Sequence, residues 1–81
     1  MDVKGVLGKI DDVLADYSMP RRVKVALAQI KADLSKDDKG TDVAVTSAIY
    51  TLDEITNDVN ISMHAKTIIW DIISDLEALK R

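Results

Sequence analysis

The stretch AKTIIWDIISDLEAL, residues 65–79, decides the fold class of this 81-residue chain. Its apolar residues recur in steps of three and four, which aligns them along one side of an α-helix. These residues are Ala65, Ile68, Ile69, Ile72, Leu76 and Leu79. Because an apolar stripe must be covered to be stable in water, the segment predicts a helix that packs against other helices.

Three earlier segments carry similar stripes. The first stripe consists of Val3, Val6, Leu7, Ile10, Val13, Leu14 and Tyr17, the second of Val23, Ala26, Leu27, Ile30 and Leu34, and the third of Val45, Ala48, Ile49, Leu52, Ile55, Thr56 and Val59. Together with residues 65–79 they predict helices roughly at 2–16, 19–35, 42–57 and 62–80. No segment alternates as a half-buried strand does. We therefore predict one all-α domain over residues 1–81.

The helix boundaries have their own signals. The polar stretch SKDDKGTD, residues 35–42, has the composition of a linker. Pro20 fits the first turn of the second helix, and Ser18 is a suitable N-cap before it. Asn60 is a suitable N-cap before the fourth helix.

The second half of the chain repeats the first at an offset of 42 residues. Seven overlaid positions are identical, and the four apolar stripes keep their phase without a gap. This agreement predicts an internal duplication of a helical hairpin. Two hairpins bury most apolar surface by closing face to face, so we expect a four-helix antiparallel bundle made of two similar hairpins.

Composition excludes several classes of function. The chain has no Cys, one His and a net charge of −3. It therefore holds no disulfide or thiolate metal site, and bulk non-specific nucleic-acid binding is disfavoured. No apolar run approaches the ~20 residues that cross a bilayer, and the first residues lack the layout of a signal peptide. We expect a cytoplasmic protein without membrane contact.

Three segments resemble a known family. They are DYSMPRRVKVA (16–26), AIYTLDEITND (48–58) and ISMHAKTIIWDIISDLE (61–77). With these residues the chain resembles the small archaeal family known as uncharacterised protein family 0147, over most of residues 11–77. The family pattern usually has Arg at Lys66 and Pro at Ser62. The resemblance implies a compact helical bundle in an archaeal cytoplasm, and it brings no activity and no catalytic residues.

No set of residues has the spacing of a catalytic or metal site. His64 is the only histidine, and a catalytic triad or a His-rich metal site needs further groups beside it. The paired carboxylates are Asp11/Asp12, Asp37/Asp38 and Asp53/Glu54. Neighbours in a helix point about 100° apart, so such pairs do not converge on an ion. We predict no enzymatic activity, no cofactor and no bound metal.

Trp70 lies off the apolar stripe of its helix, beside Lys66 and Ile73. It either packs at the seam between two helices or is partly exposed as a binding anchor. The second helix has its own off-stripe residues, Val25, Ala28 and Ala32. The two flanks could meet within the bundle or across the two-fold axis of a dimer.

A basic patch is the second candidate surface. It consists of Arg21, Arg22, Lys24 and Lys31, and no acidic residue occurs between Tyr17 and Ala32. One interpretation is an ion-pair network with Asp16 and Asp58 that ties the two hairpin turns together. The other is a weak, salt-sensitive contact with nucleic acid or an acidic protein.

These features predict a small non-enzymatic module that binds another protein, or itself as a homo-oligomer, through the flank around Trp70. The alternative is a weak RNA- or ribosome-associated factor that uses the basic start of the second helix. The identity of the partner does not follow from the residues.

Overall fold

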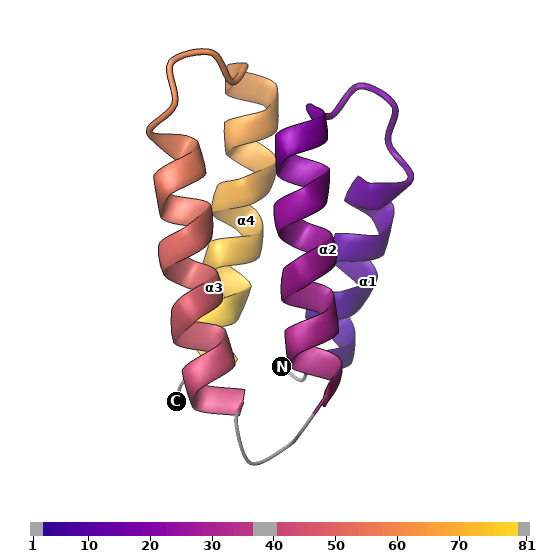
Figure 1. Ribbon diagram of the computed structural model, residues 1–81, viewed down its shortest axis with the longest axis vertical. Coiled ribbons are helices and arrows are strands. Elements are labelled where there is room, and N and C mark those ends of the chain that lie inside the picture. Colours follow the sequence, from indigo (N-terminus) through magenta and orange to yellow (C-terminus); the bar gives the residue numbers. More distant parts are fainter. Residues whose placement is uncertain (1–2, 37–40, 80–81) are drawn as a thin grey trace.

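The computed structural model describes residues 3–36 and 41–79, which form four α-helices (Figure 1). The helices are α1 (Val3–Leu14), α2 (Arg21–Lys36), α3 (Thr41–Thr56) and α4 (Met63–Leu79). No strand occurs in these two ranges. The predicted all-α class is therefore confirmed.

The predicted helices, roughly 2–16 and 42–57, end two residues and one residue after the observed ones. α1 ends at Leu14 and α3 at Thr56. Tyr17 and Val59 continue the apolar stripes in sequence, but they lie in the connections and are 98% and 89% exposed. Counting them as core residues was wrong. Most of the predicted linker at 35–42 lies outside the described residues.

The two connections contain the same local turn. The Asp16 carboxylate accepts hydrogen bonds from the backbone N–H of Ser18 (2.8 Å) and from its hydroxyl (2.6 Å). The Asp58 carboxylate likewise accepts the backbone N–H of Asn60 at 2.9 Å. An Asp side chain that binds the N–H two residues on stabilises a turn in place of another helical turn. This turn closes each connection after its helix has ended.

The predicted N-caps were wrong. The hydroxyl of Ser62 accepts the backbone N–H of Ala65 at 3.2 Å, so α4 is capped by Ser62 and not by Asn60. At the start of α2, the carbonyl of Pro20 accepts the N–H of Lys24 at 3.2 Å, as the carbonyl of Ser62 accepts the N–H of Lys66 at 3.0 Å in α4. Pro20 therefore holds the N-cap position and opens the first turn, as was expected of it. The hydroxyl of Ser18, which was expected to cap α2, is bound to Asp16.

Each helix packs against two others. α1 contacts α2 and α4, and α3 contacts α2 and α4, while no close contact joins α2 to α4 within the described ranges. α2 and α4 are therefore diagonal to one another, and successive helices run in opposite directions (Figure 1). This is the arrangement expected of a four-helix bundle, in which short connections make neighbours antiparallel.

The buried residues recur at the 42-residue offset. In α1, α2 and their connection they are Val6, Ile10, Val13, Met19, Val23, Leu27, Ile30 and Leu34. Their counterparts are Ala48, Leu52, Ile55, Ile61, Ala65, Ile69, Ile72 and Leu76, all of them buried. The N-terminal pair (α1 and α2) and the C-terminal pair (α3 and α4) thus build matching halves of one core. That the halves arose by duplication stays a prediction.

Candidate interaction surface

Large apolar side chains remain exposed mainly on the C-terminal pair. Among the described residues they are Tyr17, Val25, Val43, Tyr50, Val59, Met63 and Trp70. Five of these seven lie on α3, on α4 or in the connection between them. Exposed apolar residues that gather on one part of a surface commonly mark a contact site.

Trp70 lies off the buried stripe of α4, on the flank away from α1. Neighbouring residues in a helix point about 100° apart, so Trp70 and Asp71 occupy opposite flanks of the buried stripe. Asp71 pairs with Lys9 of α1, so Trp70 lies on the flank away from that helix. Trp70 is 47% exposed. Trp70 is therefore half exposed, and its role as a binding anchor stays a prediction.

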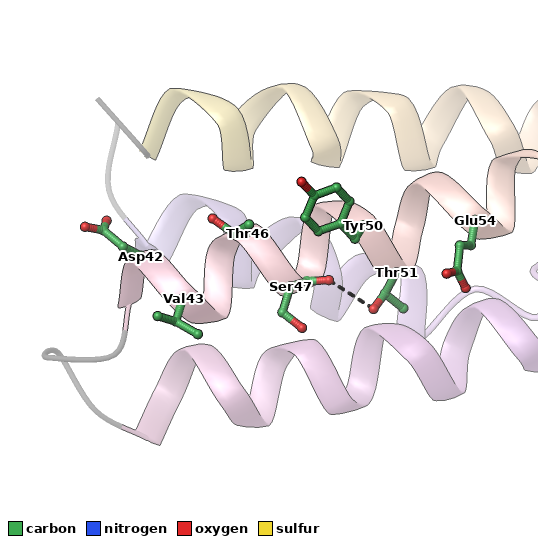
Figure 2. A pocket seen from close by; sticks show the side chains of 7 residues that line it. All are labelled: Asp42, Val43, Thr46, Ser47, Tyr50, Thr51 and Glu54. Carbon is green, nitrogen blue, oxygen red and sulfur yellow. Dashed lines mark hydrogen bonds between the residues drawn. The ribbon is translucent and has the colours of Figure 1, made fainter.

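Tyr50 lies on the matching side of α3. Figure 2 shows its ring leaning from α3 toward α4, and the residue is 68% exposed. Val43 precedes Tyr50 by seven residues, as Met63 precedes Trp70, and a seven-residue step returns to nearly the same side of a helix. We call the outer surface that carries Val43, Tyr50, Met63 and Trp70 the aromatic face.

A shallow, open depression of ≈ 530 Å³ lies on α3 and shares Val43 and Tyr50 with this face. Its lining residues are Asp42, Val43, Thr46, Ser47, Tyr50, Thr51 and Glu54 (Figure 2). The hydroxyl of Thr51 donates to the backbone carbonyl of Ser47 at 3.0 Å, so that group is already engaged. α3 contains no Lys, Arg or His. The depression therefore combines an apolar ring with acidic ends, and no catalytic set converges there.

The N-terminal pair lacks the aromatic side chains. The counterparts of Tyr50 and Trp70 at the 42-residue offset are Gly8 and Ala28, both exposed. A Cβ added at Gly8 would meet no atom within 4 Å. The same core pattern is thus built in the N-terminal pair without a large side chain at either position.

The other predicted surface residues are divided between two helices. Lys66 and Ile73 are half-buried beside Trp70, whereas Val25, Ala28 and Ala32 are exposed on α2. Because α2 and α4 are diagonal, the two flanks do not meet within the bundle. A meeting across a dimer two-fold is left as a prediction.

The basic start of α2 is tied to the C-terminal pair. Arg22 forms an ion pair with Asp58, in the connection between α3 and α4. The matched carboxylate, Asp16, lies within electrostatic reach of His64. Its pKa is lowered chiefly because Ser18 donates two hydrogen bonds to it, and the charges of His64 and Lys24 add to this effect. His64 itself is exposed in the first turn of α4.

Two further basic residues have partners within the N-terminal pair. Lys31 forms an ion pair with Asp11 of α1. The Lys24 ammonium lies 5.5 Å from the centre of the Tyr17 ring, within cation–π range. Arg21 is exposed. Three of the four residues of the predicted basic patch are therefore engaged by groups of the same chain.

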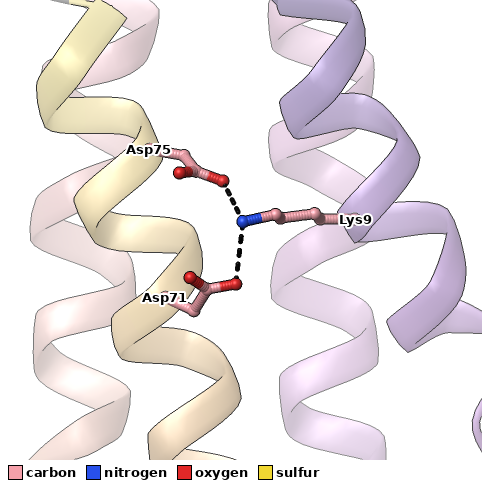
Figure 3. Close-up of polar contacts among 3 residues, drawn as sticks. All are labelled: Lys9, Asp71 and Asp75. Carbon is pink, nitrogen blue, oxygen red and sulfur yellow. Dashed lines mark hydrogen bonds and ion pairs between the residues drawn. The ribbon is translucent and has the colours of Figure 1, made fainter. Parts of the chain in front are cut away.

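A charge cluster joins α1 to α4 (Figure 3). The Lys9 ammonium lies 2.9 Å from Asp71 Oδ2 and 2.5 Å from Asp75 Oδ2. The Asp75 side chain is only 12% exposed, so Lys9 supplies the charge that balances it. The hydrogen bond to Asp71 and the contact with Asp75 raise the pKa of Lys9 above its ordinary value. The sequence contains no sign of this cluster, because Lys9 lies more than sixty residues from both aspartates.

A groove of ≈ 350 Å³ lies next to the cluster and has both charged and apolar walls. Its lining residues are Lys9, Asp12, Val13, Asp16, Ile68, Asp71 and Ile72. Within residues 3–36 and 41–79, no three His, Asp or Glu side chains are placed to hold a metal ion. The pair Asp37/Asp38 falls outside those ranges. None of the described helices is long and apolar enough to cross a membrane.

Sequence reasoning identified Trp70, Lys66 and Ile73 but missed Val43, Tyr50 and Met63. The signal that could have found them is the seven-residue spacing of large apolar residues off the stripes of both α3 and α4. Such a second stripe indicates a helix with two faces to cover.

Comparison with known proteins places similar chains in archaea. The model of the uncharacterised protein family UPF0147 matches residues 2–79. The UPF0147 protein MJ1419 of Methanocaldococcus jannaschii is 37% identical over 78 residues, which cover 96% of this chain and 84% of the relative. The UPF0147 protein Ta0600 of Thermoplasma acidophilum is 33% identical over 76 residues, covering 94% and 86%.

Two solved structures have the same fold. A crystal structure of a UPF0147 protein from Thermoplasma acidophilum superposes with a TM-score of 0.87 at 33% identity, covering 94% of this chain and 89% of that one. The crystal structure of MMP1188, a protein of unknown function, gives a TM-score of 0.82 at 31% identity, covering 96% and 89%.

Proposed function

Because this chain belongs to the uncharacterised protein family UPF0147, which brings a fold but no assigned activity, we propose a function from its surface. It is a small, non-enzymatic protein-interaction module of the cytoplasm that binds through the aromatic face. The partner is another protein or a second copy of the chain.

One observation carries the proposal. Tyr50 and Trp70 are exposed where the matched positions of the N-terminal pair hold Gly8 and Ala28. The N-terminal pair builds the same core pattern without an aromatic residue at these positions, so the two rings are not required for the fold. Tyr and Trp are enriched among the residues that dominate binding energy at protein interfaces.

The exposed part of the two rings is large enough to matter. Trp70 is 47% exposed and Tyr50 is 68% exposed. Covering these parts would contribute on the order of 5 kcal/mol, at ~25 cal/mol per Å² of apolar surface. The entropy lost on association opposes this gain, so the rings alone support modest affinity.

The test has two measurements. Static light scattering follows self-association, and the tagged protein is used to capture partner proteins. Trp70→Ala and Tyr50→Ala should weaken self-association or partner capture by at least about tenfold, since hot-spot truncations commonly cost ~2 kcal/mol. Tyr17→Ala is the control, because it removes an even more exposed ring (98%) that lies in the connection between α1 and α2 and not on the aromatic face. Assembly and capture that are the same in all three variants and the wild type would refute the proposal.

The RNA-binding alternative stands second. Its basic residues are largely engaged: Arg22 with Asp58, Lys31 with Asp11 and Lys24 with a Tyr ring. Breaking such contacts to reach phosphates would cost part of the binding energy. Filter binding over a salt series tests it, because phosphate contacts give an affinity that falls steeply with salt. RNA retention at low ionic strength that is lost in Arg21→Ala would favour this alternative.

A further inference from the structure

We infer that the occupant of the aromatic face is a second copy of this chain, related by a two-fold axis parallel to α3 and α4. The inference rests on the proposed function and names its partner. A two-fold axis in this direction places α3 of one copy against α4 of the other. It also leaves the position of every residue along the helix direction unchanged, so residues at the same height in one copy meet across the interface. Closed two-fold dimers are the commonest oligomers of soluble proteins.

The two rings lie at the same height. α3 and α4 are antiparallel and are joined by the connection at 57–62 (Figure 1). Tyr50 comes six residues before the end of α3, and Trp70 comes seven residues after the start of α4. At about 1.5 Å per residue, they lie about 9 and 10.5 Å from the connection. The two-fold axis therefore places each Trp70 against Tyr50 of the second copy, twice in one interface.

Two opposite charges on α3 and α4 also lie at the same height as one another. Lys66 follows the start of α4 by three residues, and Asp53 precedes the end of α3 by three. Both therefore lie about 4.5 Å from the connection, on the side of the rings. Across the two-fold axis, each Lys66 meets Asp53 of the second copy. The surface is thus complementary to itself in charge as well as in apolar contact.

Both charges lack an ion-pair partner within residues 3–36 and 41–79, although their counterparts in the N-terminal pair are engaged. Asp11, the counterpart of Asp53, pairs with Lys31, and the residue that matches Lys31 is Ile73. Lys24, the counterpart of Lys66, lies over the ring of Tyr17. The C-terminal pair thus presents the two groups that the N-terminal pair satisfies internally.

Two acidic residues at the end of the face farthest from the connection limit how far the interface extends. Asp42 lies fourteen residues before the end of α3, and Glu77 lies fourteen residues after the start of α4. The same axis brings these two acids to one height, about 21 Å from the connection. Their repulsion confines the contact to the half that holds the rings, so removing it should strengthen the dimer.

The test is a charge exchange between two variants. Lys66→Glu alone and Asp53→Lys alone each place like charges opposite one another twice, so each should dimerise at least about tenfold more weakly than the wild type. An equimolar mixture of the two restores both opposite pairs and should form heterodimers with near wild-type affinity. Sedimentation equilibrium measures the affinities, and native mass spectrometry identifies the heterodimer.

Two more variants test the repulsion at the far end and the specificity of the charge effects. Glu77→Lys should tighten the dimer several-fold, because it turns the repulsion with Asp42 into attraction. Lys4→Glu is the matched control, since it reverses an exposed charge on the N-terminal pair and should leave the affinity unchanged.

The outcomes separate this inference from the proposed function. A wild type that stays monomeric up to millimolar concentration overturns the two-fold dimer, while capture of another protein that needs Trp70 would leave the interaction surface standing. A dimer whose charge variants fail to recover on mixing also overturns the inference. A dimer that Trp70→Ala, Tyr50→Ala and Lys66→Glu all leave intact would overturn both.

Discussion

Replacing Leu52 by Ala should lower the free energy of unfolding by about 2–5 kcal/mol, the range for truncating a buried Leu in a well-packed core. Leu52 is fully buried on α3 and belongs to the single cluster that all four helices build. A domain of 81 residues has a total stability of about 4–12 kcal/mol. At the middle of both ranges, the variant should therefore lose roughly two-fifths of that stability.

Tyr50→Ala, two residues earlier on the same helix, provides the contrast. Tyr50 is on the aromatic face, and its removal should change the stability of the monomer by no more than ~0.5 kcal/mol. Urea denaturation followed by circular dichroism measures both variants, at two protein concentrations so that any effect of association is separated. Equal losses in the two variants would show that Tyr50 belongs to the core and would refute the assignment of the faces.

Three other changes test the surface. Gly8→Ala should raise the stability by about 0.5–1 kcal/mol in urea denaturation, because the added Cβ meets open space and Ala favours the helix. Lys9→Met should destabilise the fold in urea denaturation, since the mostly buried carboxylate of Asp75 loses its counter-charge. The pKa of Asp16 in the folded protein is lower than its ordinary value of 3.8, so its carboxylate stabilises the fold at pH values above 3.8. This contribution is lost as the pH falls through the folded pKa. Ser18→Ala should therefore shift the NMR titration of the Asp16 carboxyl upward and flatten the acid limb of thermal stability.

The helices and their buried sides were predictable because amphipathic periodicity follows directly from helix geometry. Their ends were not. Tyr17 and Val59 keep the phase of the stripes, yet each is preceded by an Asp whose side chain binds a backbone N–H and replaces the next helical turn. Periodicity reports which side of a helix is apolar, while local competition for backbone groups decides where the helix stops.

The candidate site was predictable only in part. Trp70 stood out because it is large and off its stripe. Tyr50 was missed because its significance depends on facing the same way as Trp70 on a neighbouring helix, and this follows only from how α3 packs on α4. The cluster of Lys9, Asp71 and Asp75 has the same origin, since packing of α1 on α4 alone brings its charges together.

The central claim is that the aromatic face closes on a second copy of the chain. Trp70 is the only Trp, so its fluorescence reports this face alone. Acrylamide quenching of Trp70 should be measured from low to high protein concentration, alongside the mass from light scattering. If the face closes on a second copy, quenching should fall as the mass doubles, and Tyr50→Ala should shift both transitions to higher concentration. Quenching that stays constant while the mass doubles, or a mass that never rises above the monomer, would contradict it.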